Sequence, residues 1–407
     1  MALIVQKFGG TSVGDLDRIR NVASRVQQEV AAGHQVAVVV SAMAGTTNQL
    51  VSWARDIGPI HDAREYDAIV ATGEQVTVGL LAIALQNLGV DARSWLGWQV
   101  PVRTDEVHGA ARIEAIDTDI MRARLAAGQV AVVAGFQGIA PDGRIATLGR
   151  GGSDTSAVAL AAALGADRCD IYTDVDGVYT TDPRIAPKAQ KLDAITFEEM
   201  LEMASLGAKV LQTRSVAMAM RHNVNLQVRS SFSDAAGTLV VNEDAIVEQE
   251  KISGIAYSPD EAKVTIQGLP DKPGIAAAIF GDLSANHINV DMIVQSATGE
   301  GQGADITFSL GSGDLAKALE LINVGKDKLG FQNIVATENV TKISVVGMAM
   351  RSQPGVAGTM FETLAERGIN IEVISTSEIK ISVLIASEYT ELAVRSLHSA
   401  FGLDAED

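Results

Sequence analysis

The chain is poor in cysteine, since Cys169 is the only one in 407 residues. A single cysteine allows no intrachain disulfide and no cysteine-based zinc site, which fits a reducing cytoplasm. Cys169 lies in a stretch that we expect to form a strand, and we interpret it as a small core residue. The cysteine content therefore predicts an intracellular protein.

Signals for export and membrane insertion are also lacking. The N-terminus has no basic region followed by an apolar segment of about 7–15 residues, so we expect no signal peptide. The longest apolar runs, such as residues 157–164, fall short of the roughly 20 residues that a membrane helix needs. We expect a soluble cytoplasmic protein with no membrane partner.

Positive charge is scarce as well. The chain has 32 Lys and Arg against 50 Asp and Glu, a formal net charge of -18. Nucleic acids need basic faces, so this balance predicts no nucleic-acid partner, although a local group of cations can still hold a nucleotide. No G-x-x-x-x-G-K-[ST] pattern occurs, which excludes a Walker A loop.

What the chain does have is a hydrophobic content of 47% and a length sufficient for two or three domains of roughly 150 residues each. Up to about residue 240, short β-branched runs alternate with amphipathic stretches, which is typical of an α/β sandwich on a largely parallel sheet. The expected strands are residues 2–5, 35–40, 129–134 and 168–173, and the expected helices are residues 15–32, 65–88, 115–127, 155–164 and 209–222. Ligands gather at the carboxyl ends of such strands. The residues at or just past these ends, which can converge, are Lys7, Ser41, Gly135 and Asp174.

Beyond residue 240 the chain carries an internal repeat. Residues 263–268, 273–276 and 287–291 match residues 342–347, 354–357 and 368–372, respectively, and the spacing from the Pro-Gly pair to the Ile-Asn pair is the same in both. We call the two matching regions the first copy and the second copy. Each predicts a strand, a turn, a helix, two strands and a helix, which is the order of a ferredoxin-like module.

The two copies close differently. Residues 330–337 can end the first copy as a strand, whereas only residues 401–407 follow the last expected helix of the second copy. Residues 252–257 are a spare strand before the first copy, and our hypothesis is that this strand completes the second copy, so that the modules interlock. The expected parts are a catalytic domain at 1–241, a polar linker at 242–251, and module regions at 252–340 and 341–407.

The sequence K-F-G-G-T-S-V-G at residues 7–14 follows an expected strand and precedes an expected helix. Free N–H groups at a helix start and a closely approaching glycine backbone bind phosphates well. Lys7 can add a positive charge that faces a transferred phosphoryl group. The plain alternative is a lysine in solvent beside an ordinary glycine turn.

A second glycine turn, G-R-G-G-S-D-T at residues 149–155, opens an alanine-rich helix. Arg150 at such a helix start makes a good carboxylate or phosphate site, because a guanidinium donates in a bidentate fork. In the alternative interpretation, Ser153 or Asp154 is a plain N-cap and Arg150 is a surface residue.

Further polar residues admit two interpretations each. Glu74, in A-T-G-E at residues 71–74, is either a solvated helix residue or a buried carboxylate that the ammonium group of a substrate would satisfy. Lys209 is either a second phosphate-facing cation or a surface lysine. The loop at residues 41–47 offers hydroxyl donors. The loop at residues 174–184 can hold an adenine, with Arg184 near the phosphates, and it lacks the Glu that would close a calcium loop.

Five motifs in order resemble the aspartate kinase branch of the amino acid kinase family. They are K-F-G-G-T-S-V-G, S-A-M-A-G-T-T-N, A-T-G-E, G-R-G-G-S-D-T and Y-T-D-V-D-G-V-Y-T-T-D-P-R. The repeat resembles a pair of ACT domains, the amino-acid-sensing modules at the C-terminus of aspartate kinases. The resemblance covers nearly the whole chain, and the length argues against bifunctional relatives that append a homoserine dehydrogenase.

This resemblance implies an αβα sandwich followed by two ferredoxin-like ACT domains. It implies transfer of the γ-phosphoryl of ATP, which brings Mg²⁺, to the β-carboxylate of L-aspartate. The products are 4-phospho-L-aspartate and ADP, in the first step towards lysine, threonine and methionine.

The resemblance also implies a role for individual residues. The catalytic residues would be Lys7, Glu74, Asp154 and Lys209. The substrate would contact Ser41, Thr47, Glu74, Arg150, Gly151, Gly152 and Ser153. The nucleotide would contact Lys7, Phe8, Gly9, Gly10, Thr173, Asp174, Tyr179, Arg184, Lys209 and Val210. No residue is expected to hold a resident metal ion.

The ACT pair implies feedback by an amino acid made downstream of aspartate, such as lysine, threonine or both together. Effector contacts would involve Asn289, Val290, Asp291, Met292, Gln295, Asn370, Ile371, Ser375, Thr376, Ser377 and Glu378, although the polar ones can also simply end strands. A homo-oligomer through the ACT domains is expected. Some similar proteins add a separate small ACT subunit from an internal start. No Met lies between Met220 and Met292, which leaves a GUG codon at Val241 or Val247.

Two other functions stay open. One is another amino acid kinase, such as an acetylglutamate or glutamate 5-kinase, which the repeat and the Lys-Phe-Gly-Gly-Thr-Ser start disfavour. The other is a catalytically silent amino-acid sensor. The presence of Lys7, Glu74, Arg150, Asp154 and Asp174 argues against that.

Overall fold

The computed structural model describes residues 1–206, 210–245, 252–297, 303–351 and 355–405. These residues form two compact units. The first unit comprises Met1–Val178, Lys191–Ser205 and residues 210–245, and the second comprises Tyr179–Gln190, Leu206 and the described residues from 252 onward. The segment Tyr179–Gln190 therefore packs within the second unit, although it lies inside the stretch expected as the catalytic domain.

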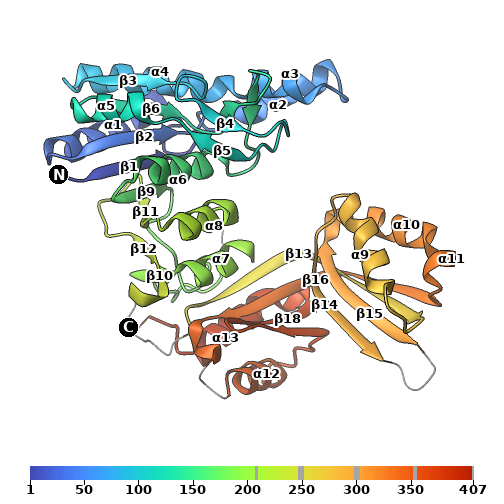
Figure 1. Ribbon diagram of the computed structural model, residues 1–407. Helices are drawn as coiled ribbons and strands as arrows, with labels where there is room; N and C mark the ends of the chain where they lie inside the picture. The colour runs from blue at the N-terminus through green and yellow to red at the C-terminus, as the bar shows by residue number, and fades with distance from the viewer. Residues whose placement is uncertain (207–209, 246–251, 298–302, 352–354, 406–407) are drawn as a thin grey trace. The chain divides into compact units, whose positions relative to one another are not determined.

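An eight-stranded sheet forms the centre of the first unit, in the order β10-β12-β11-β9-β1-β2-β6-β3 (Figure 1). Every neighbouring pair is parallel except β11 and β12. The strands are β1 (Leu3–Phe8), β2 (Gln35–Val40), β3 (Ala92–Trp95), β6 (Val130–Ala134), β9 (Arg168–Thr173), β10 (Ala194–Thr196), β11 (Leu226–Ser230) and β12 (Thr238–Val241). The predicted α/β class with a largely parallel sheet is confirmed.

Helices cover both faces of this sheet. The helices of the first unit are α1 (Leu16–Ala31), α2 (Thr46–Ile57), α3 (Ala63–Val70), α4 (Thr72–Asn87), α5 (Asp119–Ala126), α6 (Gly152–Leu164), α7 (Phe197–Ser205) and α8 (Thr213–His222). Of these, α2 and α3 pack mainly on each other, and α3 also packs on a smaller sheet. Successive strand residues point to opposite faces. Phe8 accordingly joins the core formed with α1 and α4, and Lys7 points to the other face, where α6 packs against β1, β2 and β9.

A four-stranded sheet, β5-β4-β7-β8, completes the first unit and was not expected from the sequence. Its strands are β4 (Val102–Thr104), β5 (Ile113–Ile116), β7 (Gln137–Ile139) and β8 (Ile145–Thr147). Strands of three or four residues are too short to show a period of two. The prediction of a helix from residue 115 is wrong for this reason, because β5 ends at Ile116 and α5 begins at Asp119.

Three further helix predictions need correction. The single helix expected at residues 65–88 is two helices that meet at Ala71, whose carbonyl accepts a hydrogen bond from Nε2 of Gln137 at 3.0 Å. The helix expected from residue 155 begins three residues earlier, at Gly152. The helix expected from residue 209 begins at Thr213, and Lys209 itself lies outside the described residues.

By length and composition alone, the helical stretch at residues 63–87 is apolar enough to cross a membrane. This is weak support for a membrane span, because half of the stretch is buried inside the molecule. Val78, Leu81 and Leu85 belong to the core between α4, α1 and the large sheet. Their burial accounts for the apolar composition.

The second unit is built on a six-stranded sheet in the order β14-β15-β13-β16-β18-β17. The strands are β13 (Gly254–Leu269), β14 (Val290–Ala297), β15 (Ala304–Gly311), β16 (Asn333–Val346), β17 (Val373–Thr376) and β18 (Lys380–Ala386). The helices are α9 (Ile275–Ala285), α10 (Leu315–Val324), α11 (Lys326–Leu329), α12 (Val356–Glu366) and α13 (Thr390–Ala400). Separate cores lie under the first and second copies.

Two long strands serve both copies. The C-terminal part of β13 pairs with β15, and its N-terminal part, Gly254–Ser258, pairs with Lys342–Val346 of β16 (Figure 1). The spare strand before the first copy is thus hydrogen-bonded to the first strand of the second copy, which is the interlocked pairing. The segments expected as two strands at 330–337 and 342–347 are continuous in β16.

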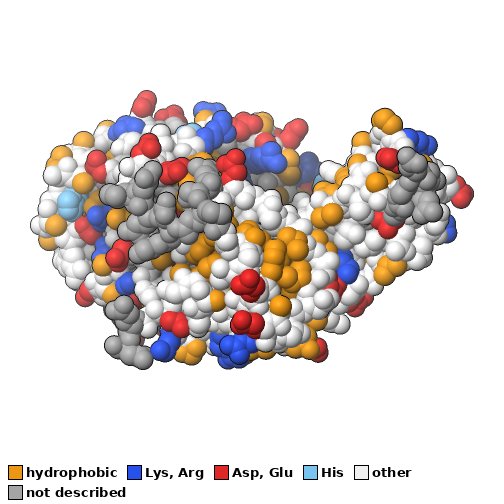
Figure 2. Space-filling view, turned by 90° about the horizontal axis from the view of Figure 1, so that it is seen from below, with side chains coloured by type: hydrophobic (Ala, Val, Ile, Leu, Met, Phe, Trp, Pro, Cys, Tyr) orange, Lys and Arg blue, Asp and Glu red, His pale blue; other side chains and the backbone are white. Residues whose placement is uncertain are grey.

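The charged side chains are mixed on the surface. On the face seen in Figure 2, the described Lys and Arg side chains lie singly or in small groups among Asp and Glu.

Candidate functional site

Four neighbouring parallel strands of the first unit end in register. Phe8 of β1 pairs with Val40 of β2 and with Tyr172 of β9, and Val40 pairs with Ala134 of β6. The ladder continues one residue further, since Gly9 N donates to Tyr172 O, Ser41 N to Phe8 O and Gly135 N to Val40 O. The structure therefore brings the ends of these strands to one edge of the sheet, where ligands of α/β proteins bind.

Lys7 and Asp154 form a buried ion pair at this edge. The Nζ atom of Lys7 lies 2.6 Å from Oδ1 of Asp154, and each side chain is 11% exposed. Asp154 stands in the first turn of α6, so the pair joins the end of β1 to the start of that helix. A β-carbon at Gly9 would lie 3.3 Å from Nζ of Lys7, and glycine therefore leaves the ammonium group space toward the strand end.

The glycine segment at residues 7–14 leads from β1 into a helix, as the sequence predicts. Helix α1 begins at Leu16, after its N-cap Asp15, whose side chain accepts a hydrogen bond from Arg18 N at 2.8 Å. Asp15 therefore occupies one of the N–H groups that the sequence suggested would be free for a phosphate. A β-carbon at Gly10 would lie 3.0 Å from the Ala42 carbonyl oxygen, so the turn is held close to the loop after β2.

Helix α6 supplies the free N-terminus. Its N-cap is Gly151, in a left-handed conformation with φ of 71°, and no side chain caps it. The alternative in which Ser153 or Asp154 is the N-cap is therefore wrong. Ser153 packs so tightly that a β-carbon at Gly135 would lie 2.8 Å from its Cβ. The uncapped first turn of α6, with its partial positive charge, lies next to Lys7 and favours an anion.

Arg150 is exposed between two glycines with positive φ, Gly149 at 74° and Gly151 at 71°. Left-handed backbone at both neighbours makes a tight turn that glycine adopts without strain. The turn presents the guanidinium outward from the start of α6. Gly152, by contrast, is buried against Phe136 and Leu148.

Glu74 is buried in the first turn of α4, with only 3% of its surface exposed. Its Oε1 accepts a hydrogen bond from Ala42 N at 3.0 Å, and Oε2 is buried without a hydrogen-bond partner among the described residues. Burial raises the pKa of Glu74 to about 7, against a smaller effect of the Ala42 hydrogen bond. The alternative of a solvated helix residue is wrong, and the free oxygen suits an ammonium donor.

The loop after β2, which donates to this carboxylate through Ala42 N, has the two expected hydroxyl residues on either side of Ala42. Ser41 follows β2 directly, and Thr47 stands in the first turn of α2, both half-buried. A β-carbon at Gly73 would lie 2.6 Å from Cβ of Ala42, so only glycine lets α4 approach the loop so closely. The sequence therefore places Glu74 beside the loop by means of a glycine.

The expected nucleotide residues are distributed over both units. In the first unit, Thr173 ends β9 and its hydroxyl donates to Oδ1 of the exposed Asp174 at 3.1 Å, while Phe8 is fully buried and stacks on Tyr172 with ring centroids 4.5 Å apart. Val210 is half-buried ahead of α8.

Tyr179 and Arg184 belong to the second unit. Arg184 is largely exposed, and its guanidinium forms a fork with the carboxylate of Asp182, with Nη2–Oδ2 at 2.6 Å. This carboxylate raises the pKa of Arg184. The guanidinium is therefore pre-oriented by an acidic neighbour in its own loop.

The expected effector residues of the first copy surround a bulge in β14. The register of β14 against β15 shifts between Asp291 and Val294, where Met292 has a φ of 47°. Asn289 and Gln295 are exposed, Val290 is half-buried and Met292 is buried. Gln295 lines a cavity of about 320 Å³ together with the loop Asp271–Gly274 at the start of α9. From the sequence, the Pro-Gly pair of this loop is a landmark of the repeat, but the loop was not assigned to the effector site.

Asp291 is engaged within the second unit. Its Oδ2 lies 2.7 Å from Nζ of the buried Lys342, which also lies 3.4 Å from Glu261. Although partial burial acts in the other direction, Lys342 lowers the pKa of Asp291. A matching pair joins Lys263 to Glu372. Because Lys263 corresponds to Lys342 and Asp291 to Glu372 in the repeat, each copy pairs its lysine with the acidic residue of the other.

The expected effector residues of the second copy lie on and around β17. Ser375 is half-buried and pairs in register with Ser382 of β18, and Ile371 packs against the core of this copy. Ser377 N donates to the Lys380 carbonyl in the turn before β18. The exposed members of the set are Asn370, Thr376, Ser377 and Glu378.

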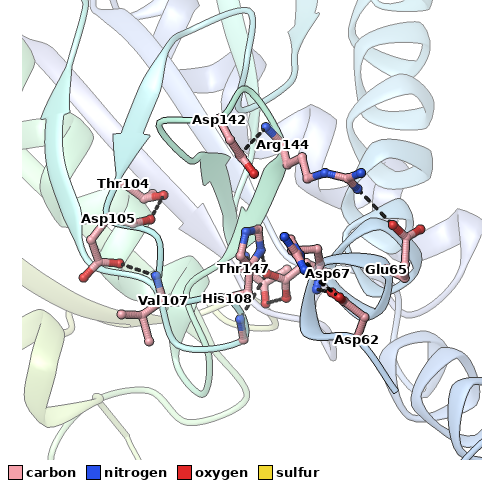
Figure 3. A network of polar contacts seen from close by, with 12 residues as sticks. Asp62, Glu65, Asp67, Thr104, Asp105, Val107, His108, Asp142, Arg144 and Thr147 are labelled. Carbon is pink, nitrogen blue, oxygen red and sulfur yellow. Dashed lines mark hydrogen bonds and ion pairs between the residues drawn. The ribbon is translucent and has the colours of Figure 1, made fainter. Parts of the chain in front are cut away.

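A buried carboxylate that sequence reasoning missed is Asp67 on α3. It accepts hydrogen bonds from His108, Gly109 and Thr147, which lie on the small sheet and its loop (Figure 3). The available signal was an acidic residue directly before the apolar run at residues 68–70 of a helix. That signal does not name the partners of the carboxylate.

Comparison with known proteins agrees with this geometry. The amino acid kinase family matches residues 2–230, and ACT domains match residues 264–324 and 343–401. An aspartokinase of Pseudomonas aeruginosa is 55% identical, covering 100% of this chain and 98% of its own length. Aspartokinase III of E. coli in complex with aspartate and ADP is 28% identical with a TM-score of 0.82, covering 98% of this chain and 100% of that one. The same enzyme in complex with lysine and aspartate is 29% identical with a TM-score of 0.77, covering 98% and 99%. The chain therefore belongs to the aspartate kinases of the amino acid kinase family.

Proposed function

We propose that the protein transfers the γ-phosphoryl group of ATP to the β-carboxylate of L-aspartate, giving 4-phospho-L-aspartate and ADP. The observation that carries the proposal is the buried Lys7–Asp154 pair beside the uncapped start of α6, with the unpaired oxygen of Glu74 at the neighbouring loop. These groups suit an anionic phosphoryl group and an amino acid. The E. coli relative that binds aspartate and ADP supports the same assignment.

The amino acid is held by groups of opposite charge. Glu74 takes the ammonium group with its free Oε2, and Arg150 clamps the α-carboxylate with a bidentate fork. Ser41 and Thr47 place the substrate side chain from the loop after β2. The start of α6 stabilises the negative charge of that side chain, mainly through the amide of Ser153, because Gly152 N already donates to the Gly149 carbonyl at 3.0 Å. The β-carboxylate is then directed toward the phosphates.

Phosphoryl transfer needs positioning and charge neutralisation more than covalent help. A β-carboxylate oxygen forms a bond to the γ-phosphorus while the bond between that phosphorus and the bridging oxygen breaks, and ADP leaves with the electron pair. The carboxylate is already an anion at pH 7, so no general base is required. Lys7 neutralises charge on the transferred group, Asp154 orients Lys7, and Lys209 is expected to act as a second cation.

ATP is the co-substrate, and Mg²⁺ enters as its counter-ion. The exposed carboxylate of Asp174 at the end of β9 offers a hard oxygen donor, the type that Mg²⁺ prefers. Gly9 and Gly10 approach the phosphates through their backbone, beside Phe8. Thr173, Tyr179, Arg184 and Val210 are expected to hold the rest of the nucleotide. The ion compensates phosphate charge when it is bound.

Regulation by lysine, threonine or both is part of the proposal. The cavity between Gln295 and the Asp271–Gly274 loop supports an effector site in the first copy, because it combines a helix start with polar side chains. Lysine bound to the E. coli relative is consistent with it. We further propose a cytoplasmic homo-oligomer that forms through the ACT domains, with or without a separate small ACT subunit.

The test is to incubate the protein with L-aspartate and Mg-ATP and to trap the acyl phosphate as a hydroxamate. The assay is run alone, with lysine, with threonine and with both. Loss of activity only with both effectors would indicate concerted inhibition, and activity indifferent to all of them would contradict the regulatory proposal. Absence of hydroxamate would refute the substrate, pointing to another amino acid kinase or to a silent sensor.

A variant tests the role of Lys7. Lys7→Ala should lower kcat at least about a hundredfold, because the charge acts on the transferring group, while the KM for aspartate changes much less. Lys317→Ala, at an exposed lysine of α10 in the second unit, is the matched control and should leave kcat unchanged. An unchanged kcat in Lys7→Ala would refute the assignment of Lys7 as the cation that neutralises the transferred phosphoryl group.

A further inference from the structure

The carboxylate of Asp67 is the centre of a buried polar network in the first unit. Asp67 is 0% exposed. Its Oδ2 accepts hydrogen bonds from Nδ1 of His108 at 2.8 Å, Gly109 N at 3.0 Å and Thr147 N at 3.0 Å, and its Oδ1 accepts one from the Thr147 hydroxyl (Figure 3). A buried carboxylate with four donors is fully satisfied, and each donor is in turn fixed by it.

The network fastens three separate segments to one another. Asp67 lies on α3, His108 and Gly109 lie in the loop between β4 and β5, and Thr147 is the last residue of β8. The loop between β4 and β5 also binds β8 directly, because Ala111 N donates to the Thr147 carbonyl at 2.9 Å. Asp67 therefore determines where the end of β8 lies relative to the loop.

The turn that carries Arg150 comes directly after β8. Thr147 is three residues before Arg150, and a β-carbon at Gly149 would lie 3.0 Å from the carbonyl oxygen of Gly109. The Gly149 backbone thus rests on the loop that Asp67 holds. Arg214 of α8 binds both the β8 end and the loop, because its guanidinium donates to the carbonyls of Leu148 at 2.8 Å and Ala111 at 2.7 Å.

We propose that Asp67, with His108 and Thr147, is a positioning unit that aims Arg150 at the α-carboxylate of the amino acid substrate. The inference rests on the proposed function, in which Arg150 binds that carboxylate. Arg150 is itself exposed between two glycines, and its turn is supported on both sides, because Gly149 packs on the carbonyl of Gly109 and Gly151 packs on the side chain of Gln212. Asp67 contacts no reacting atom in this scheme and acts only through Arg150.

Substitutions of Asp67 and Thr147 test the unit. Asp67→Asn retains the shape but turns one acceptor oxygen into an N–H donor that faces other donors. The KM for aspartate should rise about tenfold, with less than a threefold change in kcat and in the KM for ATP. Thr147→Val removes only the hydroxyl donor and should raise the KM for aspartate severalfold, whereas Thr147→Ser keeps the hydroxyl and should behave as wild type.

A double-mutant cycle with Arg150→Ala distinguishes positioning from general damage. If Asp67 acts through Arg150, Asp67→Asn should change the KM for aspartate less than twofold in the Arg150→Ala background. A full tenfold effect in that background would overturn the proposal. So would a Thr147→Ser variant as impaired as Thr147→Val, or equal changes in the KM values for aspartate and ATP.

The control for damage to α3 is Asp62→Ala, which removes the exposed N-cap of that helix. It should lower stability without changing the KM for aspartate. If Asp67→Asn does not fold, the Thr147 variants and their cycle with Arg150→Ala decide the question. The activity of the wild type distinguishes failure of the proposed function from failure of the positioning unit. If the wild type does not phosphorylate aspartate, the proposed function is refuted. If the wild type is active but the effects of Asp67→Asn and Arg150→Ala are independent in the double-mutant cycle, only the positioning unit is refuted.

Discussion

Replacing Glu74 by Gln should make the ligand-free protein more stable and raise the KM for aspartate. Gln has the same size and retains the acceptor for Ala42 N, but it carries no charge. The pKa of Glu74 is about 7 in the folded chain against 4.5 for a free carboxyl, because burial disfavours the anion. An ionised Glu74 therefore costs the folded state free energy that a buried amide does not.

The sign and size of this difference in folding stability follow from proton linkage. The folded state binds the Glu74 proton more tightly than the unfolded state, so folding stability is lost as pH rises from about 4.5 to 7. At about 1.4 kcal/mol per pH unit, the cost is about 1 kcal/mol at pH 5 and about 3 kcal/mol at pH 8. Glu74→Gln should exceed wild type in stability by these amounts.

The assay is urea unfolding of ligand-free wild type and Glu74→Gln at pH 5, 6.5 and 8. The three tryptophans, Trp53, Trp95 and Trp98, all lie in the first unit, so their fluorescence reports unfolding around Glu74. Glu114→Gln, at an exposed position of β5, is the control and should show no such trend.

Activity completes the test. The substrate ammonium pairs with ionised Glu74, so the KM for aspartate should fall in wild type as pH rises through about 7. In Glu74→Gln it should be at least about tenfold higher and should not show this pH dependence. A stability difference that is the same at pH 5 and pH 8 would refute the reasoning, because it would mean that no ionisation cost exists.

Two further predictions concern stability, one in each unit. Gly135→Ala places a β-carbon 2.8 Å from Cβ of Ser153, so it should destabilise the first unit by about 1–3 kcal/mol in urea unfolding and lower kcat by displacing α6 from Lys7. Gly79→Ala, in open space on α4, is its control and should stabilise by up to about 1 kcal/mol. Lys342→Met leaves the buried carboxylate of Glu261 unpaired and should destabilise the second unit by about 3 kcal/mol, more than Lys263→Met at its half-buried equivalent. Calorimetry measures the difference, and the reverse order would contradict the interpretation of Lys342 as the buried partner.

The part of the site that could be predicted from sequence is the part encoded locally. A buried strand that ends near Lys7, Ser41 or Gly135 carries its own signal, because parallel strands end at a shared edge. The cap of α6 could not be predicted, since Ser153 is a better cap by type than Gly151 and only the left-handed backbone decides between them. Asp67 could not be recognised either, because its partners His108 and Thr147 lie 41 and 80 residues away.

The two copies of the repeat could be found by matching segments of the sequence, but the lengths of their strands could not be predicted. Pro259 and Asp260 suggest a turn, yet β13 continues through them with register shifts on both sides of Glu261. A bulge tolerates proline within a sheet, and the sequence does not distinguish it from a chain reversal.

The shared strands β13 and β16 have a consequence for how the regulatory half can evolve. A cut between the copies near residue 340 would leave Gly254–Ser258 without its partner Lys342–Val346 and expose a new strand edge. Neither copy can therefore be lost, exchanged or acquired by itself. The pair should melt in one transition and be inherited as one block, so that new effector specificity has to arise by point substitution within the duplicated unit.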